Sequence, residues 1–218
     1  MLYLNVSLLD GYTTTSEMEQ FMWDERYKSE VYAYGTEPND FLIEVCAKLP
    51  RGDVLCLAEG EGRNAVWLAS QGFAVTAVDS SGVGLEKANK LANERGVKIN
   101  TVKADLADFE IGVQRWDVIV SIFCHLPPAL RRDVHQRCVS GLRAGGMMLL
   151  EAYTPDQLNY NTGGPPKVEM MMDAQSLDME LNGLEFLHLE ECVRDLHEGE
   201  FHNGTGSIVQ ALAIKPKQ

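Results

Sequence analysis

Apolar runs that alternate with helical segments are the feature that most restricts how this chain can fold. Strands are predicted at residues 53–57, 74–78, 99–103, 116–122 and 147–152, and helices at 64–71, 81–95 and 127–142. Glycine follows each helix, as Gly72, Gly96 and the pair Gly145 and Gly146. Buried strands joined by helices form parallel sheets covered on both faces, so we expect a doubly wound α/β fold.

The C-terminal part of the chain follows a different pattern. Residues 186–196 and 207–214 are two more strand candidates with no helix between them. They flank the glycine-rich sequence HEGEFHNGTG, which favours a β-hairpin. The complete prediction is a mostly parallel, seven-stranded sheet that ends in an antiparallel hairpin strand. This is not the commonest layout of a dinucleotide-binding domain.

Two segments lie outside the strand and helix alternation. Two helical segments between Met18 and Lys48 are separated by YAYGTEP, and residues 154–175 are irregular and rich in proline and glycine. We predict that residues 1–48 form a helical cover over a ligand site. Residues 49–218 are expected to form one domain with a lid-like insertion near 154–175.

The sequence VLCLAEGEGRN, residues 54–64, marks the predicted ligand site. Gly60, Gly62 and Ala65 fit the G-x-G-x-x-A pattern of a nucleotide-binding loop that leaves a strand and opens a helix. Asp79 ends the second predicted strand, where a carboxylate can accept both hydroxyls of a ribose. The alternative is that Asp79 caps the next helix, because Ser80, Ser81 and Gly82 follow it. With the glycine loop upstream, we favour ribose.

The loop also carries two acids, Glu59 and Glu61. Like charges 4 Å apart repel by about 1 kcal/mol in water and about 4 kcal/mol at an effective dielectric near 20, so a pyrophosphate is disfavoured here. S-adenosylmethionine has a ribose and two cationic groups but no phosphate, and Arg63 or a backbone amide could bind its carboxylate. The loop therefore favours S-adenosylmethionine over NAD(P), unless both glutamates point to solvent.

Five features follow one another along the chain: VLCLAEGEG, Asp79, the sequence KADL at 103–106, WDVIVS at 116–121 and GLRAGGMMLLEAY at 141–153. Together they resemble the motifs of class I S-adenosylmethionine-dependent methyltransferases, and the resemblance covers residues 23–216. WDERY, YGTEPN and GEGRN further resemble the small bacterial tellurite-resistance and thiopurine types. The resemblance implies ribose binding by Asp79 and adenine binding by Asp105. The expected cofactor-binding residues are Ala58, Glu59, Gly60, Gly62, Arg63, Asp79, Ser80, Asp105, Leu106, Phe123 and Tyr34.

The chain departs from the family's first motif at two positions. Cys56 stands where the family usually has an aspartate that serves the methionine ammonium, and Glu59 or Glu61 could substitute for it. Ala58 replaces a glycine, which is tolerable only if its φ angle is negative. These departures keep open a cofactor-binding protein without catalysis as an alternative function.

His125, in SIFCHLPP, is the best candidate for a catalytic general base, because it follows the fourth strand at the mouth of the site. The alternative, which we favour, is a wall or capping histidine. Phe123, Cys124 and His125 should all line the site. Two further groups of side chains also have two interpretations. Tyr27, Tyr32 and Tyr34 could cover the cofactor, or they could take part only in ordinary helix packing. Met170–Met172 could line an acceptor pocket, or they could pack on the core. His197 and His202 are interpreted as surface residues.

Composition excludes several partners. The formal net charge of −13 argues against nucleic acid or an anionic membrane as the main partner. We expect no signal peptide, no membrane span and no metal site, and we expect five reduced cysteines in a cytoplasmic protein. The predicted activity is methyl transfer from S-adenosylmethionine to a small molecule, with a soft thiol or chalcogen as one acceptor class, by a monomer or weak homodimer. The first alternative is an NAD(P)-dependent oxidoreductase.

Overall fold

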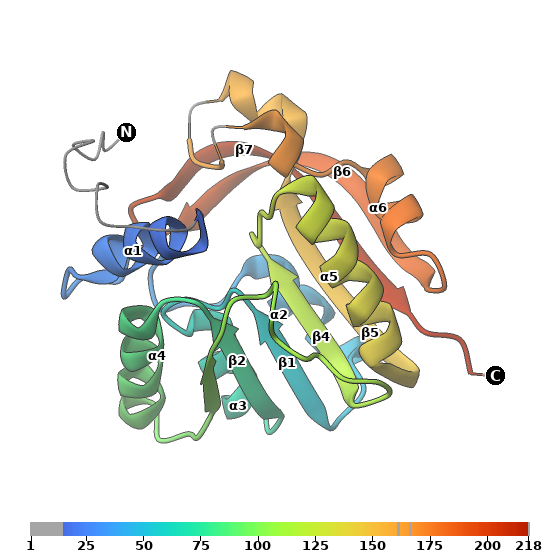
Figure 1. Ribbon diagram of the computed structural model, residues 1–218, viewed down its shortest axis with the longest axis horizontal. Helices are drawn as coiled ribbons and strands as arrows, with labels where there is room; N and C mark the ends of the chain where they lie inside the picture. Colours follow the sequence, from blue (N-terminus) through green and yellow to red (C-terminus); the bar gives the residue numbers. More distant parts are fainter. Residues whose placement is uncertain (1–14, 161, 166, 218) are drawn as a thin grey trace.

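A seven-stranded sheet organises the molecule, with strand order β3-β2-β1-β4-β5-β7-β6 (Figure 1). The computed structural model describes residues 15–160, 162–165 and 167–217. The first five strands are parallel, and β7 is antiparallel to both β5 and β6. This confirms the predicted fold class. The strands are β1 (Asp53–Leu57), β2 (Ala74–Asp79), β3 (Asn100–Lys103), β4 (Trp116–Ile122), β5 (Leu142–Tyr153), β6 (Glu185–Glu198) and β7 (His202–Ile214).

Six α-helices in the described part of the chain connect and cover these strands. They are α1 (Thr15–Tyr27), α2 (Asp40–Val45), α3 (Arg63–Ser70), α4 (Gly82–Glu94), α5 (Pro128–Gly141) and α6 (Ala174–Glu180). The predicted pair of N-terminal helical segments corresponds to α1 and α2, while residues 1–14 of the expected cover lie outside the described residues. The predicted lid contains two short 3₁₀ turns, at Pro155–Asn159 and Val168–Met170, and the start of α6. The helix α6 was not predicted.

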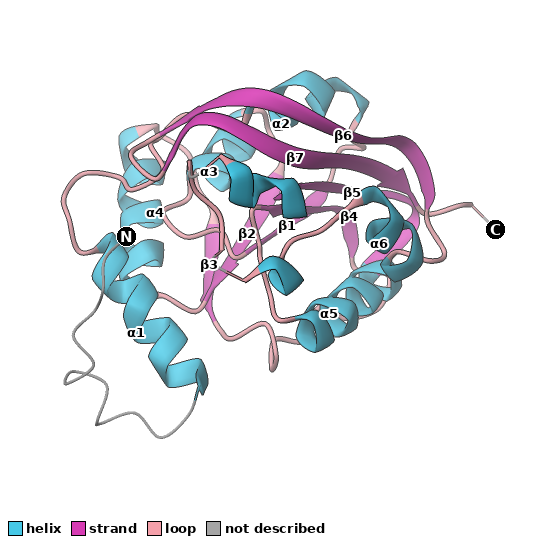
Figure 2. Cartoon of the chain, turned by 90° about the horizontal axis from the view of Figure 1, so that it is seen from above, coloured by secondary structure: helices cyan, strands magenta, loops and turns pink. Residues whose placement is uncertain are grey.

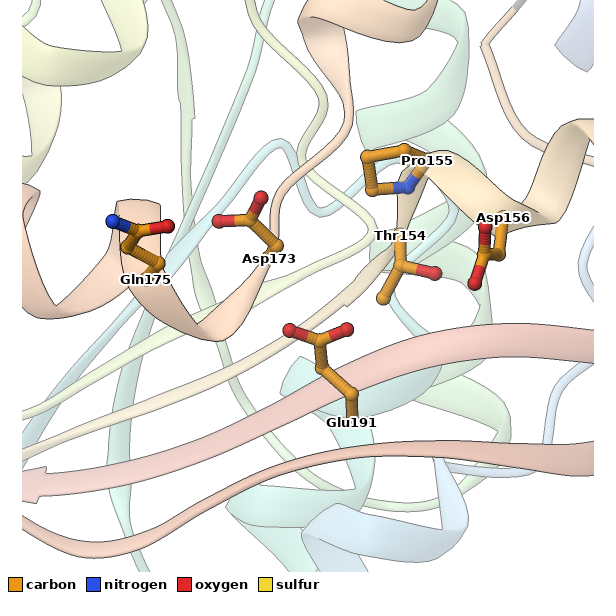
Figure 3. Close-up of a pocket in the computed structure, with 6 residues that line it drawn as sticks. All are labelled: Thr154, Pro155, Asp156, Asp173, Gln175 and Glu191. Carbon is orange, nitrogen blue, oxygen red and sulfur yellow. The ribbon is translucent and has the colours of Figure 1, made fainter.

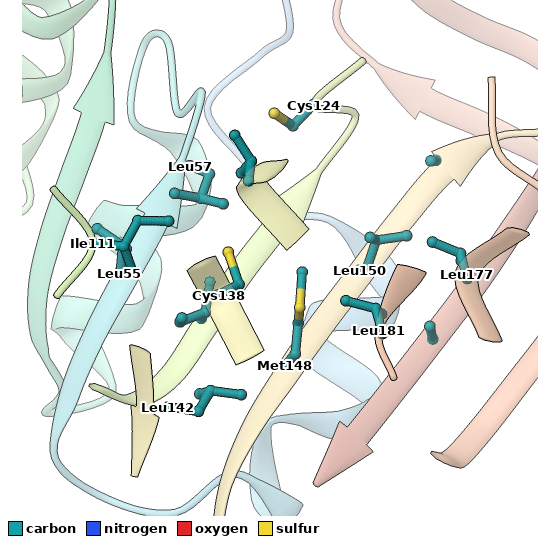
Figure 4. Close-up of a cluster of buried hydrophobic side chains, with 14 of the residues drawn as sticks. Leu55, Leu57, Ile111, Cys124, Cys138, Leu142, Met148, Leu150, Leu177 and Leu181 are labelled. Atoms are coloured by element: carbon teal, nitrogen blue, oxygen red, sulfur yellow. The ribbon is translucent and has the colours of Figure 1, made fainter. Parts of the chain in front are cut away.

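Alternate side chains of each central strand enter one of two hydrophobic layers. Leu55 and Leu57 face the layer that packs against α5 and α6 (Figure 4), while Val54 and Cys56 face the layer that contains α2 and α3. Burying a side chain of this size stabilises the fold by about 1.5–3 kcal/mol. The two layers fix β1 and β4 side by side, and with them the loops that follow these strands.

A buried ion-pair cluster joins α6 to α5. The carboxylate of Glu180 accepts from the Arg131 guanidinium at 2.8 Å and lies 2.8 Å from Nδ1 of His135. Burial raises the pKa of Glu180, but the hydrogen bonds from His135 and Arg131 outweigh it and hold the pKa at about 2. Glu180 therefore stays ionised at neutral pH and fixes α6 against the body of the sheet.

The hairpin of β6 and β7 is longer than predicted and runs along one side of the molecule (Figure 2). Only residues 199–201 form its turn, and the Ala33 carbonyl accepts from the amides of Glu200, at 3.0 Å, and Phe201, at 3.4 Å. A Cβ on Gly199 would lie 2.5 Å from the same carbonyl, so the two segments pack backbone to backbone. The hairpin tip therefore packs directly against the segment between α1 and α2.

Candidate functional site

The loop after β1 takes its shape from two glycines with different roles. Gly60 has φ +60° and packs under Tyr27, since a Cβ there would lie 2.5 Å from the tyrosine hydroxyl. Gly62 has φ +88° and is the residue before α3. A Cβ on Gly62 would lie 2.5 Å from Cβ of Ala88, so the absence of a side chain lets α3 begin directly against α4. The close approach of α3 to α4 is by itself enough to require a glycine at position 62.

Ala58 does not have the negative φ that we expected. Its φ is +47°, in the left-handed region, and that prediction is wrong. Phe123, which follows the neighbouring strand β4, has φ +53°. Left-handed backbone costs a residue with a Cβ about 1–2 kcal/mol, and such strained residues cluster at functional sites. The two strained positions follow adjacent strands, at the edge of the sheet where ligands bind in this architecture.

Asp79 lies buried at the end of β2 and is held by the loop beside it. Its Oδ2 accepts from the Gly60 amide at 2.8 Å, and its Oδ1 accepts from the Ser81 amide at 2.8 Å. The helix cap is Ser81, whose hydroxyl accepts from the Gly84 amide at 3.0 Å, so Asp79 is not the capping residue. Burial raises the pKa of Asp79. A carboxylate oxygen has two lone pairs, so each oxygen can still accept one ribose hydroxyl.

Both acids of the glycine loop have structural partners, and neither points freely to solvent. Glu59 Oε1 accepts from the Ala65 amide at 2.7 Å and so caps α3. Burial raises the pKa of Glu59 to about 7. Burial and then the Glu59 carboxyl raise the pKa of the Cys56 thiol, so the two side chains lie close together. Glu59 is therefore the loop acid next to Cys56, the position where the sequence departs from the expected aspartate.

Glu61 holds the covering segment instead of facing the ligand site. It is 4% exposed, its Oε2 accepts from the Ala33 amide at 2.8 Å, and its carboxylate pairs with Lys87 of α4. The Lys87 ammonium also donates to the carbonyls of Ser29, at 2.7 Å, and Val31, at 2.9 Å. The Lys87–Glu61 pair thus fastens residues 29–34 over the loop. Our expectation that Glu61 attracts the cationic cofactor loses its basis, because Lys87 neutralises it.

The three N-terminal tyrosines divide between covering and packing. Tyr27 is buried, and its pKa is raised well above the ordinary value by burial and by the nearby Asp79. Tyr34 packs against His202 with the ring centroids 4.5 Å apart and the rings tilted by 56°, and its hydroxyl accepts from Arg26 at 2.9 Å. Tyr32 instead lies against α4, where its hydroxyl donates to the Lys87 carbonyl at 3.2 Å. Tyr27 therefore lies near Asp79 and Tyr34 lies against His202, whereas Tyr32 packs on α4.

His125 uses both ring nitrogens to bind backbone. Its Nδ1 lies 3.1 Å from the Phe123 carbonyl, and its Nε2 accepts from the Tyr153 amide at 3.0 Å. Burial lowers the pKa of His125 to about 3. The ring is thus a neutral bridge between the ends of β4 and β5, as the wall or capping interpretation requires. In this geometry no ring nitrogen is left to accept a substrate proton.

His202 is a site residue that the sequence did not indicate. The prediction that it lies on the surface is wrong, because His202 is the first residue of β7 and is only 8% exposed. Its ring centroid lies 4.5 Å from Phe123 and 5.4 Å from Tyr153, and its Nδ1 lies 3.4 Å from Glu198 Oε2. The predicted turn was too long and so included His202. His197, one strand position away from Glu198, is exposed as expected.

A buried polar network stands behind this aromatic cluster. Nη2 of Arg63 donates to Glu198 Oε2 at 2.8 Å, while Nη1 of Arg63 is buried with no hydrogen-bond partner among the described residues. The Asn39 amide bridges Glu198, at 2.8 Å, and Glu151, at 2.7 Å. A guanidinium with one nitrogen paired and the other free suits a ligand carboxylate. Arg63 and Asp79 together therefore fit the methionine carboxylate and the ribose of S-adenosylmethionine.

The remaining predicted residues occupy less enclosed places. Asp105 follows β3, is partly exposed, and accepts at Oδ1 from the Ala107 amide at 2.9 Å, while Leu106 is buried in the core. Ser80 is partly exposed next to Asp79. Of the three methionines, Met172 lies in the main core and Met171 packs with Tyr153, so only Met171 adjoins the aromatic cluster.

A separate hollow lies between β6 and the start of α6 (Figure 3). Its carboxylates serve α6, because Asp173 accepts from the Ser176 amide at 2.7 Å and Glu191 accepts from the Ala174 amide at 2.8 Å. Over the described ranges, no group of three or more His, Cys, Asp or Glu side chains could hold a metal ion. Within the same ranges, no helix is long and apolar enough to cross a membrane.

Comparison with known proteins assigns the central part of the chain. Residues 54–146 match the model of a protein family described as "Methyltransferase domain". This segment is similar to a methyltransferase domain. It contains the glycine loop, Asp79, Asp105, Phe123 and His125. The match confirms the predicted enzyme class, an S-adenosylmethionine-dependent methyltransferase, and with it the predicted cofactor. The search of curated proteins found no match to this sequence.

Solved structures extend the similarity to almost the whole fold. One, reported for the conversion of a disulfide bond into a thioacetal group during echinomycin biosynthesis, has a TM-score of 0.73 at 18% identity and covers 93% of each chain. TehB from Haemophilus influenzae has a TM-score of 0.67 at 19% identity, over 90% of this chain and 67% of that one. The N-methyltransferase NodS from Bradyrhizobium japonicum WM9, solved with S-adenosylhomocysteine, has a TM-score of 0.66 at 12% identity, over 91% and 98%. At these identities the likeness shows the fold.

Proposed function

We propose that this methyltransferase transfers the methyl group of S-adenosylmethionine to a small molecule with a soft nucleophile, a thiol or a heavier chalcogen. The observation that carries the proposal is the enclosed cluster of Tyr34, Phe123, Tyr153 and His202 next to the glycine loop. Aromatic walls favour an apolar, polarisable acceptor and also attract a sulfonium. Within the class, we place the chain with the small tellurite-resistance and thiopurine types.

The proposed cofactor contacts follow from the site. Asp79 accepts the ribose hydroxyls, Arg63 binds the carboxylate through its free Nη1, and Asp105 accepts from the adenine amine. Glu59, beside Cys56, serves the ammonium group. The remaining proposed contacts are Ala58, Gly60, Gly62, Ser80, Leu106, Phe123 and Tyr34.

The proposed chemistry needs alignment more than acid or base from His125. Methyl transfer is an in-line displacement, in which the protein aligns three atoms and keeps water out. The covering segment held by Lys87 and Glu61, and the hairpin tip bound to Ala33, supply that enclosure. We further propose that the protein acts as a monomer or weak homodimer in the cytoplasm.

The dinucleotide alternative meets two obstacles. The Glu59 carboxyl already accepts from the Ala65 amide at 2.7 Å, so it occupies a backbone donor at the start of α3 that a phosphate would use. The antiparallel β7 also stands beside β5, where the common dinucleotide-binding order has a sixth parallel strand.

Two measurements test the proposal. Isothermal calorimetry should show binding of S-adenosylhomocysteine and none of NAD, and tighter binding of NAD would reject the cofactor. A turnover assay with alkyl thiols, selenols, amines and alcohols should then show methylation of the sulfur and selenium compounds first. Cofactor binding without turnover of any acceptor would favour a non-catalytic binding protein.

A further inference from the structure

We propose that His202, held by Glu198, accepts the proton of the methyl acceptor. This inference rests on the proposed function and refines it, since it requires an acceptor whose nucleophilic atom carries an ionisable hydrogen. Neither residue lies within residues 54–146, the segment that matches the methyltransferase family.

The geometry gives His202 a bound nitrogen and a free one. Nδ1 lies 3.4 Å from Glu198 Oε2, so this nitrogen carries the hydrogen when Glu198 is ionised. Burial raises the pKa of Glu198, but the hydrogen bond with His202 and the charge of Arg63 outweigh it and hold the pKa at about 2. Among the described residues, the hydrogen bond of the His202 side chain is that of Nδ1 to Glu198, which leaves Nε2, on the opposite edge of the ring, open. This differs from His125, whose two nitrogens are both bonded to backbone.

The surroundings place this free nitrogen in the aromatic cluster. Tyr34 and Phe123 each lie 4.5 Å from the His202 ring between centroids, and Phe123 is one of the two strained residues at the strand ends. Tyr153 lies 5.4 Å away, and its hydroxyl is buried with no hydrogen-bond partner among the described residues. An unpaired buried hydroxyl costs about 1–3 kcal/mol, which a polar group on a bound acceptor would recover. Both observations point to a small ligand that lies against these rings.

The electrostatic setting keeps the imidazole neutral before it reacts. Burial lowers the pKa of His202, while Glu198 opposes this effect. The charged and titratable groups around the ring come from six segments of the fold: Glu198, Arg63, Arg26, His125, Tyr34 and Tyr153. Of these, only Glu198 is an anion at neutral pH that can stabilise the imidazolium once it forms. A neutral base backed by a carboxylate is the arrangement that general-base catalysis requires.

The proposed step transfers one proton and one methyl group. The acceptor's X–H proton moves to Nε2 of His202, and the electron pair of that bond stays on X. S-adenosylmethionine, when bound, supplies the methyl group: the pair on X forms the X–C bond, and the pair of the broken C–S bond stays on sulfur. The positive charge thus passes from the sulfonium to the imidazolium, where Glu198 stabilises it, and the proton then leaves to water.

The test compares acceptors that need a base with acceptors that do not. At pH 7, alkyl thiols are protonated, whereas electron-poor aromatic thiols are already thiolates. For His202→Gln we expect kcat with alkyl thiols to fall at least ~100-fold and kcat with the ionised thiols to change only a few-fold. His197→Gln, on an exposed position of the same hairpin, is the matched control and should match wild type. An equal loss of kcat with both kinds of thiol would show a structural role and overturn the proposal.

A second readout does not depend on turnover. Nitrogen-15 NMR of labelled histidine should show His202 protonated at Nδ1 and unprotonated at Nε2 at pH 7, and Glu198→Gln should change that tautomer balance. An Nε2–H tautomer in the wild-type protein would overturn the inference. If wild type binds S-adenosylhomocysteine but methylates no thiol, the proposed acceptor class is wrong, and the tautomer alone then decides whether His202 presents a free nitrogen.

Discussion

Substitution of Gly62 by alanine should destabilise the protein for two separable reasons. The first is backbone strain, because φ is +88° and a left-handed residue with a Cβ costs about 1–2 kcal/mol. The second is overlap, because the new methyl would lie 2.5 Å from Cβ and 2.8 Å from Cα of Ala88. Overpacking of this kind costs about 1–3 kcal/mol. The expected total is about 2–5 kcal/mol, a large part of a typical domain stability of about 5–15 kcal/mol.

Gly72 provides a matched control for the strain alone. Its φ is +87°, and a Cβ built there meets nothing within 4 Å. Gly72→Ala should therefore lose only the ~1–2 kcal/mol of the backbone contribution. The difference between the two variants measures the close approach of α3 to α4.

Urea unfolding followed by tryptophan fluorescence gives both free energies, with the m-value as a check that the unfolded states are comparable. The double variant Gly62→Ala/Ala88→Gly removes the Ala88 Cβ, one of the two atoms that the new methyl would overlap. A double-mutant cycle of these two substitutions should therefore show a favourable coupling free energy of about 1 kcal/mol. Equal destabilisation by Gly62→Ala and Gly72→Ala would refute the packing role of Gly62. The left-handed backbone conformation at Gly62 would then be enough to explain the glycine.

Three further results are expected. Asp79→Ala should weaken S-adenosylhomocysteine binding at least tenfold by calorimetry, since hydrogen bonds to a charged acceptor are worth about 1.5–3 kcal/mol each, and unchanged affinity would remove Asp79 from the site. Lys87→Met leaves the buried Glu61 carboxylate without its cationic partner, so this substitution should lower the free energy of unfolding by about 3–5 kcal/mol. It should also speed cofactor release in stopped-flow measurements. Lys90→Met, an exposed control on the same helix, should do neither. Because the pKa of Glu180 is lowered to about 2, its contribution to stability is fully present above the ordinary pKa of 4.5 and is lost as the pH falls towards 2. Glu180→Gln should remove this pH dependence from the urea midpoints. An acid transition that stays unchanged in the variant would contradict this role of Glu180.

The strands that the sequence predicted best are those buried on both faces. β1 and β4 have the predicted ends, because continuous apolar runs can be buried only in the middle of such a sheet. The helix α6 was missed because Asp173 caps it in a reciprocal pair with Ser176, where the usual sequence signal would be glutamate or glutamine. Local patterns thus identified the sheet and failed where an uncommon residue made the cap.

The site was less predictable than the sheet because its polar groups come from distant parts of the chain. Asp79 could be expected from its spacing after the glycines, but the positions of Glu198 and His202 depend on the register of a hairpin whose turn is only residues 199–201. A turn rich in glycine does not specify which of its residues remain paired. The partners of Glu61, likewise, lie on α4 and on the covering segment, which no short-range pattern connects.

The bond between the hairpin tip and Ala33 also determines when a closed site can exist during synthesis. Residues 33 and 200 are far apart in the sequence, and a ribosome adds about 5–20 residues per second, so on the order of ten seconds or more separates their appearance. Until β7 has been made, β5 is an open edge of the sheet whose strand partner is missing. The nascent chain therefore passes through a stage with the parallel strands formed, the covering segment unanchored and an apolar edge exposed, and it is at this stage that chaperones or aggregation compete with the enzyme's completion.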